Sequence, residues 1–206
     1  MEKFVITIGR QTGSRGRIIG KKLAEKLGVK CYDKEILAVA AKESGFSEQI
    51  FQYHDERPTN SFLFNLVMDT YSVGYPMSHF TELPLNQKVF LAQFDSIKKL
   101  AEEESCVIIG RCADYALKDY PNLVRIFIHG DLDYRAENIA KEQDLSLEKA
   151  RDICVKTDKK RSSYYNYYSD KKWGDSTSYD LSVNSELLGI DGTVEFLEKY
   201  IKAAIK

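Results

Sequence analysis

The first 27 residues constrain the fold of this chain most strongly, because they combine a strand, a glycine-rich loop and a helix in direct succession. The segment Phe4–Ile8 is β-branched and aromatic, which is typical of a buried strand. The loop Gly9–Arg17 holds three glycines and three arginines. Apolar residues then recur every fourth position, which predicts one face of an amphipathic helix: Ile19, Leu23 and Leu27.

This arrangement predicts a phosphate site. A turn from a strand into a helix start points backbone N–H groups at one place, where the positive end of the helix dipole also lies. We therefore expect a phosphate to contact five consecutive residues, Gly13, Ser14, Arg15, Gly16 and Arg17. The strict phosphate-loop pattern ends in Gly-Lys-Ser/Thr, but here Gly16 stands at the lysine position and Arg17 at the hydroxyl position. The alternative interpretation is a tight turn with a solvated basic rim.

The rest of the chain alternates short apolar segments with helical patterns. Five strands separated by helices predict an α/β fold, with a parallel sheet covered on both faces. The expected strands are residues 4–8, 29–32, 106–109, 123–129 and 179–183. Without internal repeats, we expect a single domain over residues 1–206.

Some segments between these strands are harder to assign. Residues 46–84 are rich in aromatics and contain Pro58, Pro76 and Pro84, so they read as an insertion of short helices and loops. Ser146 predicts the start of a helix that ends near Lys160, followed by a tyrosine-rich segment with little periodicity. Asp191 is expected to cap the last helix.

Composition excludes several classes of function. The formal net charge of -1 argues against a general nucleic-acid binder. No segment is long and apolar enough to span a bilayer, so we expect no membrane association. The cysteines are scattered, which is typical of reduced thiols in a cytoplasmic protein, and a zinc site is not expected: Cys31, Cys106, Cys112 and Cys154.

Several segments, in order along most of the chain, resemble the cytidylate kinase-like family, a branch of the P-loop nucleoside monophosphate kinases. They are Ile6–Ala24, Cys31–Glu35, Val107–Tyr115, and Trp173–Asp175 with Tyr179–Leu181. The resemblance implies a P-loop NTPase-like fold with a five-stranded parallel sheet. It also implies a helical insertion for the acceptor near residues 45–85 and a lid near residues 155–178.

The resemblance further implies the transfer of a phosphoryl group from ATP, with Mg²⁺, to a cytidylate-like nucleoside monophosphate. The sequence itself indicates no metal ligands. Gly16 in place of the P-loop lysine keeps an alternative open, a nucleotide-binding sensor or regulatory protein of kinase fold without turnover. A third alternative is a binding or oligomer-forming protein in which the loop holds a structural anion.

The resemblance gives Asp33 and Arg111 roles at the acceptor, Arg111 on its phosphate. Both follow predicted strands, at the edge where ligands of parallel sheets bind. For Asp33 the alternative is a helix N-cap, and for Arg111 it is a salt bridge to Asp114 or Asp119. Cys112 stands where the family usually has an aspartate, and we expect it to be a packed residue.

Two further residues fall in the expected lid. Asp158 and Arg161 lie three apart on a predicted helix and share a face. The resemblance implies that Arg161 reaches the transferred phosphoryl group, so that Arg17, Asp33 and Arg161 are the candidate catalytic residues. An ion pair within the helix is the alternative. The nearby tyrosines are expected to pack the lid on the body or to form a homodimer contact: Tyr164, Tyr165, Tyr167 and Tyr168.

Overall fold

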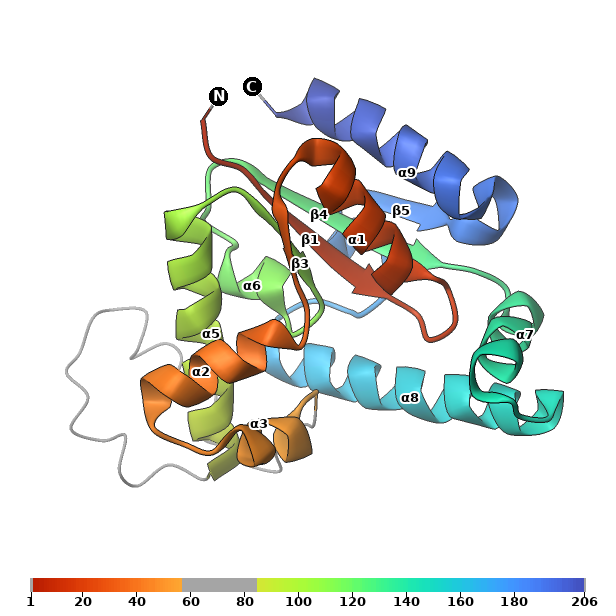
Figure 1. Ribbon diagram of the computed structural model, residues 1–206, viewed down its shortest axis with the longest axis horizontal. Coiled ribbons are helices and arrows are strands. Elements are labelled where there is room, and N and C mark those ends of the chain that lie inside the picture. The colour runs from red at the N-terminus through yellow and green to blue at the C-terminus, as the bar shows by residue number, and fades with distance from the viewer. Residues whose placement is uncertain (1, 57–84, 206) are drawn as a thin grey trace.

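A five-stranded parallel sheet forms the centre of the fold, as the sequence predicts, in the order β2-β3-β1-β4-β5 (Figure 1). The computed structural model describes residues 2–56 and 85–205. The strands lie close to their predicted positions: β1 Val5–Arg10, β2 Lys30–Tyr32, β3 Cys106–Ile109, β4 Leu123–His129 and β5 Leu181–Asn184.

The central strand, β1, pairs with β3 on one side and with β4 on the other. Ile8 is opposite Ile109 in β3 and Ile126 in β4. All the pairings are parallel, so the carboxyl ends of the strands meet at one edge of the sheet.

Helices cover both faces of the sheet because successive side chains of a strand point to opposite sides. Ile6 and Ile8 belong to a core cluster with α1, Gly16–Leu27, and α9, Ser185–Ala204. Val5 belongs to a second cluster on the other face. That cluster is completed by three helices: α5 Leu85–Glu103, α6 Ala113–Ala116 and α8 Leu147–Tyr168.

Two smaller cores flank the sheet. Phe51 of α3, Glu48–His54, is fully buried in a cluster with α2, Glu35–Ser44, and α5. The other joins α7, Leu132–Gln143, to the first turns of α8. A short 3-10 helix, Ser176–Ser178, precedes β5.

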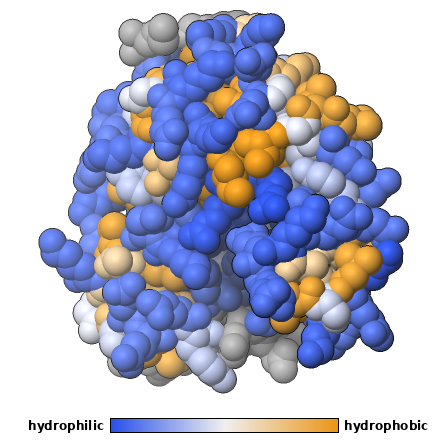
Figure 2. Space-filling model, turned by 45° about the vertical axis from the view of Figure 1, so that its right-hand side comes forward, coloured by the Kyte–Doolittle hydropathy of each residue, from blue (hydrophilic) through white to orange (hydrophobic). Residues whose placement is uncertain are grey.

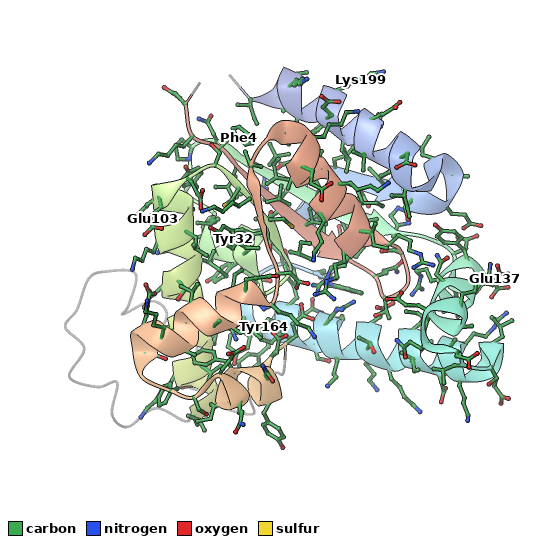
Figure 3. All side chains as sticks on the ribbon, viewed as in Figure 1. Phe4, Tyr32, Glu103, Glu137, Tyr164 and Lys199 are labelled. Atoms are coloured by element: carbon green, nitrogen blue, oxygen red, sulfur yellow. The ribbon has the colours of Figure 1, made fainter. Side chains whose placement is uncertain are left out.

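Two helix boundaries differ from those predicted. Ser146 does cap α8, accepting a hydrogen bond from the amide of Lys149, but the helix continues past Lys160 to Tyr168. The tyrosine-rich segment is helical because Tyr164, Tyr165 and Tyr168 point inward (Tyr164 is labelled in Figure 3) and are buried. The last helix begins at Ser185 with Asn184 as its cap, and Gly189 interrupts it with a non-helical backbone.

Most of the acceptor-binding insertion expected near residues 45–85 lies outside the described residues. The surface in Figure 2 is mostly hydrophilic, with hydrophobic residues in separate groups. Within residues 2–56 and 85–205, no helix combines the length and the apolar character needed to cross a bilayer.

Candidate active site

The loop between β1 and α1 is shaped by short contacts of its own. Gly13 and Arg15 both have left-handed backbones, with φ of 78° and 61°. The Ser14 hydroxyl donates to the carbonyl of Gln11 at 2.8 Å and accepts from the amide of Gly16 at 3.4 Å. Ser14 is fully buried, so its hydroxyl holds the loop together instead of facing a ligand.

An ion pair between α7 and α8 fixes the outer part of this loop. Asp158 accepts from the Thr12 amide at 2.7 Å and pairs with Arg135 at 2.7 Å. Arg135 also donates to the Thr12 carbonyl at 3.1 Å and to the Gly130 carbonyl at 2.8 Å. Asp158 is therefore a positioning residue for the loop.

The backbone of α7 lies directly against Gly13. A Cβ atom at Gly13 would lie 2.2 Å from the Arg135 carbonyl oxygen, so any side chain there would collide with the α7 backbone. Asn138, one turn further along α7, donates to the Gly13 carbonyl at 2.9 Å. Helix α7 thus holds the loop in place from outside.

A cavity of about 250 Å³ opens beside the loop and gathers most of the predicted site residues. The predicted residues that line it are Gly13, Arg15, Gly16, Arg17, Asp33, Arg111 and Arg161. Ser14 and Asp158 are not among its lining residues.

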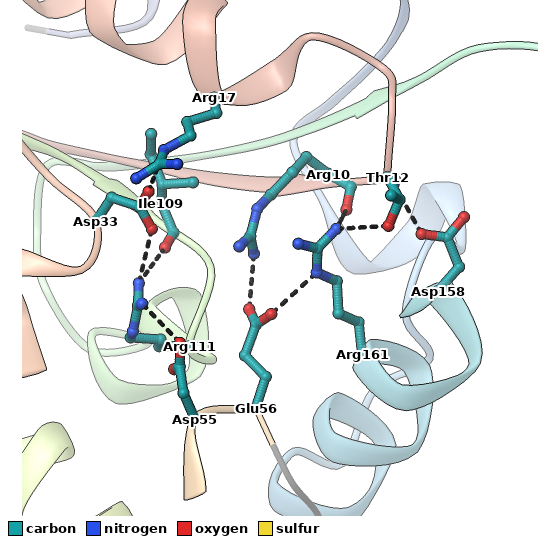
Figure 4. A network of polar contacts seen from close by, with 10 residues as sticks. All are labelled: Arg10, Thr12, Arg17, Asp33, Asp55, Glu56, Ile109, Arg111, Asp158 and Arg161. Atoms are coloured by element: carbon teal, nitrogen blue, oxygen red, sulfur yellow. Dashed lines mark hydrogen bonds and ion pairs between the residues drawn. The ribbon is translucent and has the colours of Figure 1, made fainter. Parts of the chain in front are cut away.

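Asp33 lies between two arginines at the carboxyl end of β2 (Figure 4). Its carboxylate accepts from Nη1 of Arg111 at 3.0 Å and pairs with Nε of Arg17 at 2.6 Å. The carboxylate makes no cap hydrogen bond to α2, whose N-cap is Lys34. The alternative of a helix cap for Asp33 is therefore not observed.

Arg111 is buried and bound on two sides by acids. Besides Asp33, it pairs with Asp55 through Nη2 at 3.0 Å. Burial opposes its charge, yet Asp55, Glu56 and Asp33 raise the pKa of Arg111 above its usual value. The expected alternative partner Asp114 instead accepts from the Tyr165 hydroxyl at 2.6 Å.

Glu56 pairs with two more of the arginines that line the cavity (Figure 4). One carboxylate oxygen pairs with Arg10 at 2.7 Å and the other with Arg161 at 2.9 Å. Burial raises the pKa of Glu56, but the charges of Arg10, Arg161 and Arg111 outweigh it and hold the pKa far below the usual range. Arg161 therefore pairs with Glu56, and the ion pair expected within its own helix is not observed.

Gly110 makes the close approach of these side chains sterically feasible. It has a positive φ of 74°, and a Cβ atom there would lie 2.0 Å from Nη1 of Arg10 and 2.7 Å from Oε1 of Glu56. The glycine at the end of β3 thus leaves the space in which the Arg10 guanidinium meets the carboxylate.

Arg15 and Arg17 differ in their surroundings although both line the cavity. The Arg15 guanidinium contacts α7, pairing with Glu142 at 3.3 Å and with the Asn138 side-chain oxygen at 3.1 Å. Arg17 pairs with Asp33 and is half exposed. Within the described residues, the amides of Gly13 and Arg15 donate to no protein acceptor.

Sequence reasoning missed three residues of this network: Arg10, Asp55 and Glu56. Arg10 follows the apolar part of β1 and could have been found by the strand-end rule that identified Asp33 and Arg111. No pattern distinguishes Asp55 and Glu56, which follow α3 within the unassigned insertion. Arg135 was also missed, since nothing in the sequence separates it from the other charged residues of α7.

The lining residues do not form a ready set of ligands for Mg²⁺. Each carboxylate that lines the cavity is paired with an arginine: Asp33, Asp55, Glu56 and Glu142. The Thr12 hydroxyl accepts from Arg161 at 3.0 Å. Among the residues that the structure describes, no three acidic, histidine or cysteine side chains are grouped as a metal site.

The tyrosines and Cys112 serve packing. Tyr168 stacks on Phe90 of α5 with ring centroids 3.8 Å apart and an interplanar angle of 5°. Tyr164 and Tyr165 are buried in the same cluster, as is Cys112, so these tyrosines pack α8 against the body of the chain, as one of the two expectations had it. Burial raises the pKa of the Cys112 thiol well above its usual value.

Known proteins resemble this chain over most of its length. The model of the cytidylate kinase-like family matches residues 5–187. A cytidylate kinase of Pyrococcus horikoshii is 27% identical over 206 residues, which cover 99% of this chain and 89% of the relative. A cytidylate kinase of Archaeoglobus fulgidus is 25% identical, covering 96% of this chain and 94% of the relative.

Solved structures share the same architecture. An uncharacterized protein from Eubacterium ventriosum has a TM-score of 0.73 and 30% identity, covering 97% of this chain and 99% of the other. A shikimate kinase from Bacteroides thetaiotaomicron has a TM-score of 0.56 and 14% identity, covering 97% of this chain and 98% of the kinase. At this low identity the shikimate kinase supports the fold alone.

Proposed function

This chain belongs to the cytidylate kinase-like family. On that premise we propose that it transfers the terminal phosphoryl group of ATP to a nucleoside monophosphate, with a cytidylate as the expected acceptor. One observation carries the proposal. The glycine-rich loop, Asp33, Arg111 and Arg161 come from distant parts of the chain and line one cavity. A triphosphate on the loop and an acceptor at the strand ends would therefore meet within it.

The proposed roles follow from charge and position. Phosphoryl transfer requires positioning and charge neutralisation and little covalent work from the protein. We assign the triphosphate to the loop of residues 13–17, through the amides of Gly13 and Arg15 and the guanidinium groups of Arg15 and Arg17, since the amides of Ser14 and Gly16 already donate within the loop. The acceptor phosphate is assigned to Arg111, oriented by Asp33, and the transferred group to Arg161. Several guanidinium groups thereby supply the positive charge that the P-loop lysine supplies in other kinases.

ATP enters this scheme as its magnesium complex, so the metal is part of the substrate. Among the described residues, every carboxylate that lines the cavity is paired with an arginine. We also propose that residues 155–178 form a lid over the cavity. Its arginine, Arg161, lies on α8, three residues before the first of the buried tyrosines.

The test is an assay of ADP formation with ATP, magnesium and a panel of nucleoside monophosphates. We expect product with CMP or a related pyrimidine monophosphate, and none when Arg111 is replaced by alanine. Arg125→Ala is the matched control because Arg125 pairs with Asp180 at 2.6 Å and does not line the cavity. Failure of every monophosphate to yield ADP would remove the kinase assignment.

A second candidate function is nucleotide binding without turnover, as in a sensor or regulatory protein. Gly16 at the lysine position favours it. Calorimetry distinguishes the two, because a sensor should bind ATP while ADP formation stays at the level of a control without protein.

A further inference from the structure

Glu56 binds the arginines of the cavity in the way that a phosphoryl group would. Its two oxygens contact two different guanidinium groups, Nη1 of Arg10 at 2.7 Å and Nε of Arg161 at 2.9 Å (Figure 4). Guanidinium groups bind carboxylates and phosphates through the same charge-assisted hydrogen bonds. A phosphoryl group at this place would find the same donors.

The charge balance of the cavity depends on the end of α3. Four arginines, Arg10, Arg17, Arg111 and Arg161, are paired with three carboxylates, Asp33, Asp55 and Glu56. Two of the three carboxylates are consecutive residues. Without them, these four arginines would face the single carboxylate of Asp33, because the remaining lining carboxylate, Glu142, is paired with Arg15. Such an excess attracts a polyanion of the size of a nucleotide phosphate tail.

The segment that carries these acids is not part of the sheet. Helix α3 packs against α2 and α5 through Phe51, in a cluster separate from the two that cover the sheet. The Glu56 backbone has a φ of 50°, in the left-handed region. A glutamate is uncommon there, and such a conformation is strained. The contact with the arginines thus holds a strained residue in place.

We propose that the Glu56 carboxylate competes with a substrate phosphoryl group for Arg10 and Arg161, and that ligand binding requires its displacement. Arg10 is then a further phosphate-binding residue of the cavity, in addition to Arg15 and Arg17. The proposal rests on the phosphate-binding role proposed above for this cavity. Its consequence is that the native chain binds phosphates more weakly than its arginines alone would.

The test measures the binding of pyrophosphate and of ATP by calorimetry in the full-length protein and in Glu56→Gln. The amide keeps the size of the side chain and removes the competing charge. If Glu56 holds its place about nine-tenths of the time, the variant binds pyrophosphate about tenfold more tightly. Equal or weaker binding by a folded Glu56→Gln protein would overturn the proposal.

Glu43→Gln is the matched control. Glu43 loses the same charge and also pairs across helices, with Lys99 of α5, but it does not line the cavity. We expect its pyrophosphate affinity to stay within twofold of the native value. A comparable gain in both variants would trace the effect to net charge and overturn the proposal.

A double variant tests the role of Arg10. Arg10→Gln should weaken pyrophosphate binding, and adding Glu56→Gln to it should give a smaller gain than Glu56→Gln gives alone, because the two side chains act on one site. An additive gain would remove Arg10 from the site.

A measurement on the native chain covers the case in which the variants do not fold. With glutamate labelled with ¹³C at the carboxyl carbon, Glu56 should stay ionised at acid pH in buffer alone. In saturating pyrophosphate it should titrate near the ordinary glutamate pKa of about 4.3. An unchanged titration would overturn the proposal.

These outcomes separate this proposal from the kinase assignment. Tighter pyrophosphate binding without ADP formation supports the competition and removes the kinase function. ADP formation by the native chain, together with an unchanged pyrophosphate affinity in Glu56→Gln, supports the kinase function and overturns the competition.

Discussion

At the scale of single residues, arginine side chains provide the positive charge around the cavity. Arg111 is almost fully buried between Asp33 and Asp55, whereas Arg17 is half exposed and has one carboxylate partner. A buried and doubly paired arginine is held rigidly, and a half-exposed one can turn toward a ligand. The arginines of this cavity therefore differ in what their loss should do.

Replacing Arg17 with alanine should weaken ATP binding by about 1.5–3 kcal/mol, the usual worth of a charged hydrogen bond. Arg15→Ala should cost less, because the Arg15 guanidinium already contacts Glu142 and Asn138. Calorimetric dissociation constants for both variants check the order. An unchanged constant for Arg17→Ala would remove Arg17 from the phosphate site.

Glu56 also makes stability depend on pH. Its pKa in the folded chain lies below its unfolded value, so it contributes stability above about pH 4.3 that is lost as the pH falls through the folded pKa. The pKa of Asp55 is raised by burial, against the effect of Arg111, so Asp55 contributes with the opposite sign in the range just above its unfolded pKa.

We therefore expect the free energy of unfolding of the native chain to fall more steeply between pH 5 and pH 3 than that of Glu56→Gln. Urea unfolding at several pH values in this range provides the measurement. Parallel curves for the two proteins would contradict the assignment of this pH dependence to Glu56.

At the scale of elements, the loop depends on a helix that follows it by more than a hundred residues. Helix α7 contacts Gly13 through its backbone and the loop carbonyls through Arg135 and Asn138. Asp158 of α8 adds a bond to the Thr12 amide. The glycine-rich loop is thus fixed by tertiary contacts as much as by its own glycines.

Gly13→Ala should destabilise the protein by about 2–5 kcal/mol. A left-handed alanine costs about 1–2 kcal/mol, and overpacking against the Arg135 carbonyl adds about 1–3 kcal/mol. Gly28→Ala is the matched control, since Gly28 also has a positive φ but a Cβ there would meet nothing within 4 Å. Chemical denaturation checks both, and equal losses would contradict the role given to α7.

The elements themselves could largely be predicted from sequence, because strand and helix periodicities are local signals. All five strands and the N-cap at Ser146 are found where the patterns place them. The extension of α8 to Tyr168 could not be predicted. It depends on aromatic packing against Phe90, which is a tertiary contact.

The candidate site was predictable to the extent that strand ends define it. Asp33 and Arg111 were identified because the carboxyl ends of parallel strands converge, and the structure brings them within 3.0 Å. The partners of the arginines could not be predicted. A carboxylate such as Glu56 reaches the site because the chain turns toward it after α3, and no local sequence pattern predicts the direction of that turn.

At the scale of the whole molecule, α8 links the loop to the aromatic core. Its middle carries Asp158 and Arg161 beside the cavity, and its end is buried through Tyr164, Tyr165 and Tyr168. A helix fixed in this way limits how the expected lid, near residues 155–178, can move.

Hydrogen exchange measures this restraint. We expect the amides of residues 164–168 to exchange as slowly as those of β1 and β4, with or without ATP, because opening them requires the loss of the stacked core. Faster exchange at residues 164–168 than at residues 132–143 would instead indicate a lid that moves as one unit.

The position of β1 in the middle of the sheet has a consequence for synthesis of the chain. Val5 pairs with Cys106 and Leu123, so β1 leaves the ribosome well before either of the two strands that it pairs with, and its pairing is complete only when β4 has followed. At about 5–20 residues per second, the delay from Val5 to Leu123 lasts on the order of 6–24 seconds. During this interval at least one edge of β1 is unpaired in the nascent chain, and binding by a chaperone would then protect that edge from aggregation.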